Sequence, residues 1–180
     1  SLFGPAVGDA RLDDAKRYAD FALNASRRMQ DAALAKQATD RNLALVARRT
    51  EWEAVKSAVD KLKESPDDAA ANLTIGRYRA FVEGDWTRAL PLLAKGTDAA
   101  LKALAEKSQA PAADTAALTA IGDAWWDAAQ AATGPKKAEF YAGALNWYKQ
   151  AIIGAQGLSK TRIDKRISDA QAAIPEQKLP

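Results

Sequence analysis

Cysteine and histidine are both absent from this sequence of 180 residues. Without cysteine the chain has no disulfide, no thiolate metal site and no cysteine nucleophile. Without histidine it lacks the commonest general base and the commonest ligand of transition metals. These absences argue against an enzyme, and we expect no catalytic residue, no metal site and no cofactor.

Long apolar runs and strand-like alternation are also missing. No stretch of roughly 18 apolar residues predicts a transmembrane helix, and no stretch alternates apolar and polar residues as a half-buried strand does. The sequence begins at Ser1 without a secretory signal pattern. We therefore expect a soluble protein, and both a cytoplasmic location and export followed by signal removal stay open.

The charge balance is mild. The net charge is +3, and basic residues such as Arg48-Arg49 and the segment 160–166 have interleaved acidic residues, such as Glu51 and Asp164. Interleaved charges are typical of ordinary surface pairing, and a small net charge does not predict nucleic-acid binding. A protein or peptide is the expected partner, with no nucleic acid.

Alanine is abundant, at about a quarter of the residues. It is the best helix former, and together with the missing strands it predicts an all-α protein. Capping and breaking residues divide the sequence into seven expected helices, 9–30, 31–64, 66–82, 86–107, 114–132, 135–154 and 160–173. Asp9, Ser65 and Ser159 are the expected N-caps of the first, third and seventh. Residues 1–8 are expected to be a loop or a tag remnant, and 175–180 a tail.

Residues 9–64 are expected to form a long helical hairpin with coiled-coil-like packing. Apolar residues of the second helix keep one heptad register, at Leu34, Ala38, Leu45, Trp52, Val55, Val59 and Leu62. Arg41 and Arg48 interrupt that register. The apolar residues expected on the inner face of the first helix are Ala15, Tyr18, Ala22, Ala25 and Met29. Burying unpaired arginines is costly, so we expect an intrachain hairpin in a monomer or weak homodimer.

Residues 65–174 contain an internal repeat. Residues 73–76 match residues 118–122 with one residue inserted, and each match ends in a glycine, Gly76 or Gly122. A helix follows each glycine with a small, a large and a small residue at steps of four and three, which are Ala89, Leu93 and Gly96, then Ala144, Tyr148 and Ala151. A glycine inside a helix costs about 1 kcal/mol relative to alanine. Both glycines therefore predict the close approach of a partner helix.

This pattern resembles the tetratricopeptide repeat family over roughly residues 66–174. Ile121-Gly122 followed by Trp125 fits the first helix of that family's repeat, whereas Arg79 replaces the aromatic residue after Gly76. The two glycines are 46 residues apart, against about 34 in the family. The resemblance implies a stack of antiparallel helix pairs with a concave surface for a partner.

A second resemblance is to an uncharacterised accessory helical domain of large bacterial multidomain proteins. It rests on four segments of the sequence, at residues 65–68, 84–86, 90–96 and 122–126. It covers most of residues 10–174 and includes the long helix pair at the start. It implies no active-site residues.

The residues expected to line a concave surface lie on the polar sides of the first helices of the two pairs. They are Arg77, Arg79, Asp123, Trp126 and Asp127. Asp123 and Asp127 stand one turn apart, as a cation or acid–base pair would, but a solvated helix face has the same spacing. We interpret them as such a face.

Five tryptophans remain to be explained, at positions 52, 86, 125, 126 and 147. Repeat spacing favours core packing for Trp86, Trp125 and Trp147, and Trp126 points about 100° away from Trp125 on the same helix. The sequence thus favours a non-enzymatic protein-interaction scaffold or accessory helical-repeat module of a bacterial protein. The alternative is a ligand- or glycan-binding accessory module that uses exposed aromatic residues.

Overall fold

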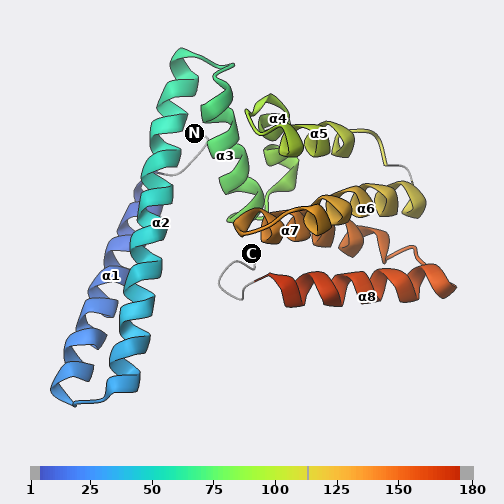
Figure 1. Cartoon of the computed structure of the whole chain (residues 1–180). Helices are drawn as coiled ribbons and strands as arrows, with labels where there is room; N and C mark the ends of the chain where they lie inside the picture. The colour runs from blue at the N-terminus through green and yellow to red at the C-terminus, as the bar shows by residue number, and fades with distance from the viewer. Residues whose placement is uncertain (1–4, 113, 175–180) are drawn as a thin grey trace. The chain divides into compact units, whose positions relative to one another are not determined.

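The computed structural model of the chain describes residues 5–112 and 114–174, with side chains from Asp13 onward. This part is entirely helical and contains no strand, which confirms the all-α class (Figure 1). Its helices are α1 (Pro5–Arg28), α2 (Ala32–Glu64), α3 (Ala69–Phe81), α4 (Trp86–Lys95), α5 (Ala99–Ser108), α6 (Thr115–Ala131), α7 (Pro135–Ala151) and α8 (Gly157–Ala173). Among these, none combines the length and apolar character that crossing a membrane requires.

Contacts group the chain into two compact units, residues 1–57 and 58–180. The expected boundary after Glu64 coincides instead with the end of α2. The expected loop over residues 1–8 is wrong in its second half, because α1 already begins at Pro5. Proline is favoured at the first position of a helix, where its missing N–H costs nothing. Residues 1–4 and the expected tail, 175–180, lie outside the described residues.

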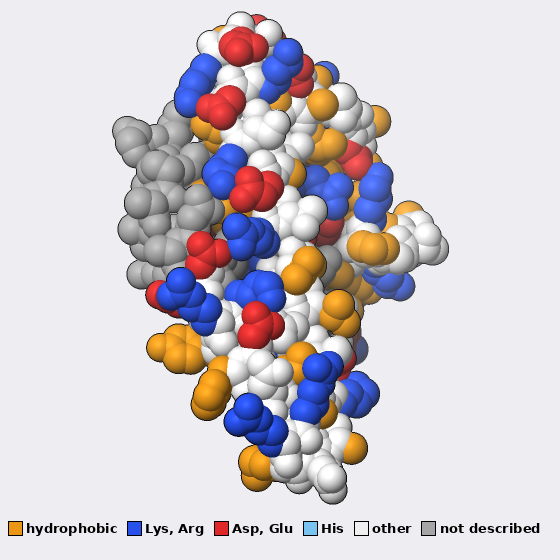
Figure 2. Space-filling view, turned by 90° about the vertical axis from the view of Figure 1, so that its left-hand side faces the viewer, with side chains coloured by type: hydrophobic (Ala, Val, Ile, Leu, Met, Phe, Trp, Pro, Cys, Tyr) orange, Lys and Arg blue, Asp and Glu red, His pale blue; other side chains and the backbone are white. Residues whose placement is uncertain are grey.

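The first unit packs α1 through small side chains. Ala19 and Ser26, two turns apart on one stripe, are buried, and Ala38 of α2 is buried as well. Tyr18 and Met29 were expected on this inner face, but they are 75% and 71% exposed. The small residues form a buried stripe on α1, and the larger residues lie to the side of it. Figure 2 shows apolar side chains exposed among basic and acidic ones.

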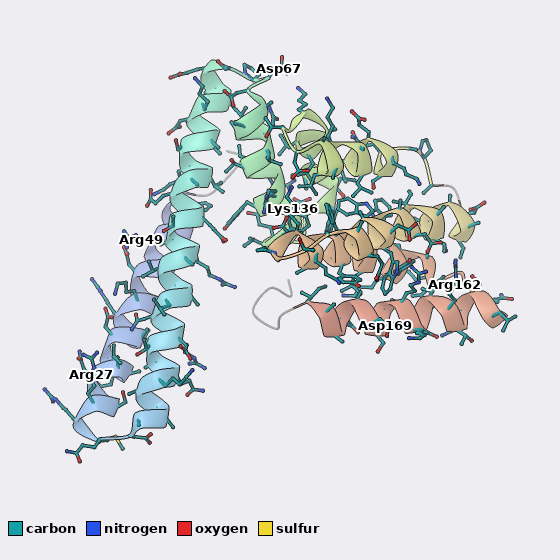
Figure 3. All side chains as sticks on the ribbon, in the orientation of Figure 1. Arg27, Arg49, Asp67, Lys136, Arg162 and Asp169 are labelled. Atoms are coloured by element: carbon teal, nitrogen blue, oxygen red, sulfur yellow. The ribbon has the colours of Figure 1, made fainter. Side chains whose placement is uncertain are left out.

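A Schellman motif ends α1. Gln30 has φ 56°, the N–H of Asp31 donates to the carbonyl of Ser26 at 3.1 Å, and the N–H of Gln30 donates to Arg27 at 3.3 Å. The carboxylate of Asp31 then accepts from the N–H of Leu34 at 2.9 Å and caps α2. Farther along α2, Arg49 forms an ion pair with Asp13 of α1 at 2.8 Å (Figure 3).

In the second unit, the single expected helix 86–107 is wrong. Gly96 is extended and ends α4, and Asp98 starts α5 by accepting hydrogen bonds from the N–H groups of Ala100 and Leu101. A glycine stop followed two residues later by an aspartate cap is sufficient to break a helix. The described residues therefore hold eight helices instead of the seven expected.

Two further N-caps differ from expectation. Asp68, not Ser65, caps α3, because its carboxylate accepts from the N–H of Ala71 at 2.9 Å. A proline disfavours helical backbone geometry at the residue before it, and Ser65 therefore lies in a turn. Helix α8 begins at Gly157, with Gln156 rather than Ser159 at its N-cap position.

The two repeated glycines lie in equivalent interhelical contacts. A Cβ at Gly76 of α3 would lie 2.9 Å from Cδ2 of Leu93 on α4, and a Cβ at Gly122 of α6 would lie 2.8 Å from the ring of Tyr148 on α7. Leu93 and Tyr148 are the central residues of the two matched patterns. Each glycine thus gives room to the large residue of the helix that follows it.

Trp125 lies at the centre of the core of the second unit. It is 0% exposed, its ring meets Trp86 edge-on at 5.4 Å, and its indole N–H donates to the hydroxyl of Ser108 at 2.9 Å. Gly143 of α7 lies directly against this ring, and any Cβ there would overlap with it. One tryptophan therefore joins α4, α5, α6 and α7.

Candidate binding pocket

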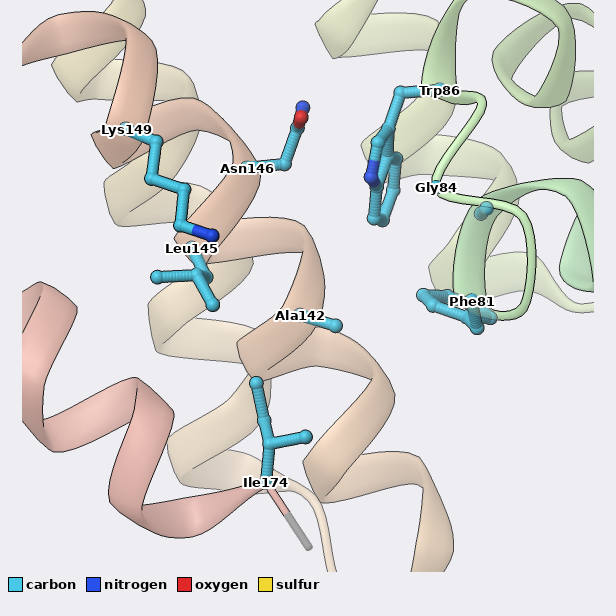
Figure 4. Close-up of a pocket in the computed structure, with 9 residues that line it drawn as sticks. Phe81, Gly84, Trp86, Ala142, Leu145, Asn146, Lys149 and Ile174 are labelled. Carbon is cyan, nitrogen blue, oxygen red and sulfur yellow. The ribbon is translucent and has the colours of Figure 1, made fainter. Parts of the chain in front are cut away.

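A pocket of about 110 Å³ lies within residues 58–180, between the α3–α4 turn, α7 and the end of α8 (Figure 4). Most of its wall is apolar. Its lining residues are Ala80, Phe81, Gly84, Trp86, Ala142, Leu145, Asn146, Lys149 and Ile174.

The α3–α4 turn sets one wall of the pocket. Gly84 has φ 69°, and the N–H of Asp85 donates to the carbonyl of Arg79 at 2.8 Å, so the chain reverses directly after α3. The buried guanidinium of Arg79 lies 3.6 Å from Glu83 and 3.7 Å from Asp85, which holds the turn closed. Trp86 follows and meets Phe81 edge-on at 5.5 Å.

Helix α7 supplies the opposite wall. Ala142, Leu145, Asn146 and Lys149 recur at three- and four-residue steps and so lie on neighbouring turns of one face. In Figure 4, the amide of Asn146 points from α7 towards Trp86, whereas Ile174 lies at the opposite end of the pocket. The pocket thus has one polar end and one apolar end.

The pocket lining includes an unpaired donor and an unpaired cation. Nδ2 of Asn146 is buried and has no hydrogen-bond partner within the described residues. Lys149 is exposed and forms no ion pair with any described residue. A buried donor without a partner costs about 1–3 kcal/mol of stability. A ligand atom that accepts a hydrogen bond from this donor would remove that cost.

A separate polar cluster joins α6, α7 and α8. The hydroxyl of Tyr148 donates to Asp123 at 2.6 Å, and Arg162 of α8 approaches the same carboxylate at 3.4 Å (Figure 3). Arg166 donates to the Tyr148 hydroxyl at 3.3 Å and lies 4.3 Å above the ring of Trp126. Burial and the Asp123 carboxylate together raise the pKa of Tyr148 well above its ordinary value of 10.0. In this cluster one carboxylate faces two arginines, and the contacts link the three helices.

The five residues expected to line a concave surface do not form one site. Arg77 is half-buried and paired with Glu139 of α7, and Arg79 is buried in the α3–α4 turn. Asp123 and the half-buried Trp126 belong to the α6–α8 cluster, and Asp127 alone is exposed. Intrahelical spacing placed these residues on polar faces, but the partners that cover them come from distant sequence.

The other tryptophans are core residues. Trp86, Trp125 and Trp147 are buried, as expected, and Trp52 is buried too. From Asp13 onward, where side chains are described, the exposed aromatic residues are Tyr18 and Phe21 of α1, each 75% exposed.

Sequence reasoning missed most of the pocket. Gly84 indicated the end of one helix, and Trp86 indicated the start of the next and a core residue, but neither indicated a pocket. One signal was available, since Asn146 is a lone amide between Leu145 and Trp147 in a helix whose buried residues are mainly apolar. A polar residue in such a setting needs a partner.

Within the described ranges, no group of three or more Asp and Glu side chains is arranged to hold a metal ion. The polar end of the pocket offers donors, which suit an acceptor group of a bound molecule. Comparisons with protein-family models, curated proteins and solved structures give no match to the chain.

Proposed function

We propose that the chain is a non-enzymatic protein-interaction module of tetratricopeptide-like type and an accessory segment of a larger bacterial protein. We propose further that it binds a peptide segment of its partner in the pocket between the α3–α4 turn and α7. The observation that carries this proposal is the unpaired, buried amide donor of Asn146 in an otherwise apolar wall.

Two features support a repeat-type binding module. The paired contacts of Gly76 with Leu93 and of Gly122 with Tyr148 repeat the same packing device along the chain. Helical repeats of this kind stack into surfaces that bind extended segments of other proteins. The pocket lies at the turn of the first helix pair, where Phe81 ends α3 and Trp86 begins α4.

The alternative is an accessory module that binds a glycan or another ligand. Its support is the exposure of Tyr18 and Phe21, since exposed aromatic rings offer a platform for sugar rings. The buried tryptophans offer no such platform. The two proposals therefore assign binding to different units of the chain.

The full chain, probed in parallel on a peptide array and a glycan array, separates them. Ala142→Leu narrows the pocket and is expected to remove peptide signals, whereas Ala103→Leu, at an exposed position of α5, leaves them unchanged. Circular dichroism checks that both variants fold. Signals confined to the glycan array and lost in Phe21→Ala would favour the alternative instead.

A further inference from the structure

We propose that the pocket takes an internal peptide segment in which an aliphatic side chain lies within two residues of an acidic one. The aliphatic side chain fills the apolar end, a main-chain carbonyl accepts from Asn146, and the acidic side chain pairs with Lys149. This inference rests on the proposed function and names the chemistry of the partner.

The volume of the pocket selects an aliphatic anchor. An apolar cavity of about 150 Å³ holds a benzene ring, and this pocket encloses about 110 Å³. Phe81, Leu145 and Ile174 supply an apolar wall. A leucine-sized side chain therefore fits, and an indole ring is too large.

Asn146 selects a neutral acceptor. Its Nδ2 is buried, so a charged ligand group that bound it would have to lose its water. Burying an ion is far more costly than burying a hydrogen-bonded carbonyl. A main-chain carbonyl beside the anchor residue supplies the missing partner without a charge. The free carboxylate of a chain terminus does not, and that difference favours an internal segment.

Lys149 selects the acidic neighbour. It lies one turn beyond Asn146 on α7, where Cβ atoms are about 5–6 Å apart, and an extended peptide advances about 3.3–3.6 Å per residue. An acidic side chain within two residues of the anchor therefore reaches it. The nearest carboxylates of the α3–α4 turn, Glu83 and Asp85, are already paired with Arg79.

Binding is tested by NMR titration of the full chain with capped hexapeptides of glycine and serine that carry a central Leu-Asp pair. We expect the Asn146 side-chain amide and the Trp86 indole signals to shift. Replacing the leucine by tryptophan, or the aspartate by lysine, is expected to weaken binding. A peptide with leucine at a free C-terminus tests the terminal carboxylate as the rival source, and tighter binding of that peptide overturns the proposal.

Two variants of the chain locate the contacts. Lys149→Glu is expected to weaken binding of the Leu-Asp peptide about three- to tenfold and to favour the Leu-Lys peptide. Lys107→Glu is the matched control, because Lys107 also lies in the last turn of its helix, away from the pocket. An equal effect of both changes would mean that only net charge matters, which contradicts the assigned role of Lys149.

Asn146→Leu separates binding from folding. It is expected to weaken binding of the Leu-Asp peptide about two- to tenfold. It is also expected to raise the melting temperature of the chain, because an unpaired buried donor is removed. A lower melting temperature with unchanged binding overturns the proposal and makes Asn146 structural. If array peptides bind through the pocket but the Leu-Asp pair confers no preference, the inferred chemistry is wrong and the proposed function stands. If no peptide binds at all, both fall.

Discussion

The second unit, residues 58–180, and helix α1 of the first unit, residues 1–57, bury side chains of different size. In the second unit, large side chains such as Trp125 and Tyr148 are completely or almost completely buried between helices. In the first unit, Ala19 and Ser26 are buried on α1, while Phe21 of the same helix is 75% exposed. The alanine-rich composition is common to both units, so it does not determine which side chains form the core.

Glycine explains the difference. The first unit has glycine only at positions 4 and 8, whereas the second unit has glycines inside α3, α6 and α7. Each of these three glycines lies against a large side chain of another helix. On α1 the buried positions are small residues, and Tyr18, Phe21 and Met29 remain exposed. The large buried residues of the first unit, Trp52 and Val55, lie on α2. Mid-helix glycine therefore marks the helices of the second unit that receive a large side chain from another helix.

The strongest test of this difference is Gly143→Ala. The added methyl group would overlap with the ring of Trp125, which is held on its other sides by Trp86 and Ser108. Overpacking costs typically ~1–3 kcal/mol, and the helix preference for alanine returns about 1 kcal/mol. Because this overlap is with a rigid ring, we expect a net loss of about 2 kcal/mol in the free energy of unfolding.

Urea unfolding of the full chain measures this loss, with Gly122→Leu as a second overpacking variant and Phe21→Ala as the control. Phe21 is exposed, so its truncation is expected to change stability by less than about 0.5 kcal/mol. A Phe21→Ala loss as large as that of Gly143→Ala would show that the first unit also depends on its large side chains.

The sequence predicted the parts of this fold that depend on local signals. The helix over 31–64 and the cap of α6 at Asp114 follow from periodicity and capping residues. Gly76 and Gly122 were also recognisable, because an unfavourable residue in a helix requires a compensating contact. The matched pattern identified Leu93 and Tyr148 as residues of the partner helices.

What the sequence did not reveal depends on contacts between distant segments. Gly143 has no counterpart in the first repeat, so the pattern gave no reason to notice it. The pocket joins residues near position 80 to residues near 145 and to Ile174, and no spacing along the chain connects them. Arg77 and Asp123 looked free because their partners, Glu139 and Arg162, come from other helices.

Tyr148→Phe tests the polar counterpart of the glycine contact. In α3–α4 the residue against the glycine is Leu93, which needs no polar partner, but the hydroxyl of Tyr148 donates to Asp123 at 2.6 Å. A hydrogen bond to a charged group contributes about 1.5–3 kcal/mol to stability. The variant keeps the ion pair between Asp123 and Arg162, which limits the loss. We expect a loss of about 1–2 kcal/mol at pH 7.

The pH dependence identifies the cause of that loss. Because the pKa of Tyr148 is raised above 10.0 in the folded chain, the unfolded chain releases this proton first. The stabilisation is therefore complete below pH 10 and declines as the pH rises above it. Thermal unfolding of the two proteins is expected to converge in that range, and a constant difference between them would exclude the hydroxyl as the cause.

Asp98 gives a test at the acidic end. Partial burial by itself raises the pKa of this carboxyl, but hydrogen bonds from Lys136 of α7 and from the α5 N-terminus outweigh it, and the net pKa is lowered. Its stabilising effect is thus present above the unfolded value near 3.8 and is lost as the pH falls through the lower folded value.

Asp98→Ala is accordingly expected to cost about 1 kcal/mol at pH 7, as the loss of an N-cap usually does. The difference from the unmodified chain should narrow below pH 4, measured by urea unfolding at pH 7 and pH 3. Asp98→Asn keeps a capping side chain without the charge and separates the cap from the Lys136 ion pair. If Asp98→Asn costs as much as Asp98→Ala, the ion pair and not the cap is responsible.

The smallest expected effect is a gain, and it belongs to the first unit. Gln30 has φ 56°, a conformation that glycine adopts readily and that other residues adopt at a cost of about 1 kcal/mol. The motif's two backbone hydrogen bonds do not involve the glutamine side chain, and Gln30 is exposed. Gln30→Gly should therefore keep the turn and relieve the strain, raising stability by about 0.5–1 kcal/mol.

Hydrogen exchange of the α1 and α2 amides measures this gain locally, with Gln37→Gly inside α2 as the control that should lose about as much stability. Slower exchange in Gln30→Gly would show that the first unit is limited by its turn as well as by its small interhelical residues. Unchanged exchange would mean that the unit opens without breaking the turn.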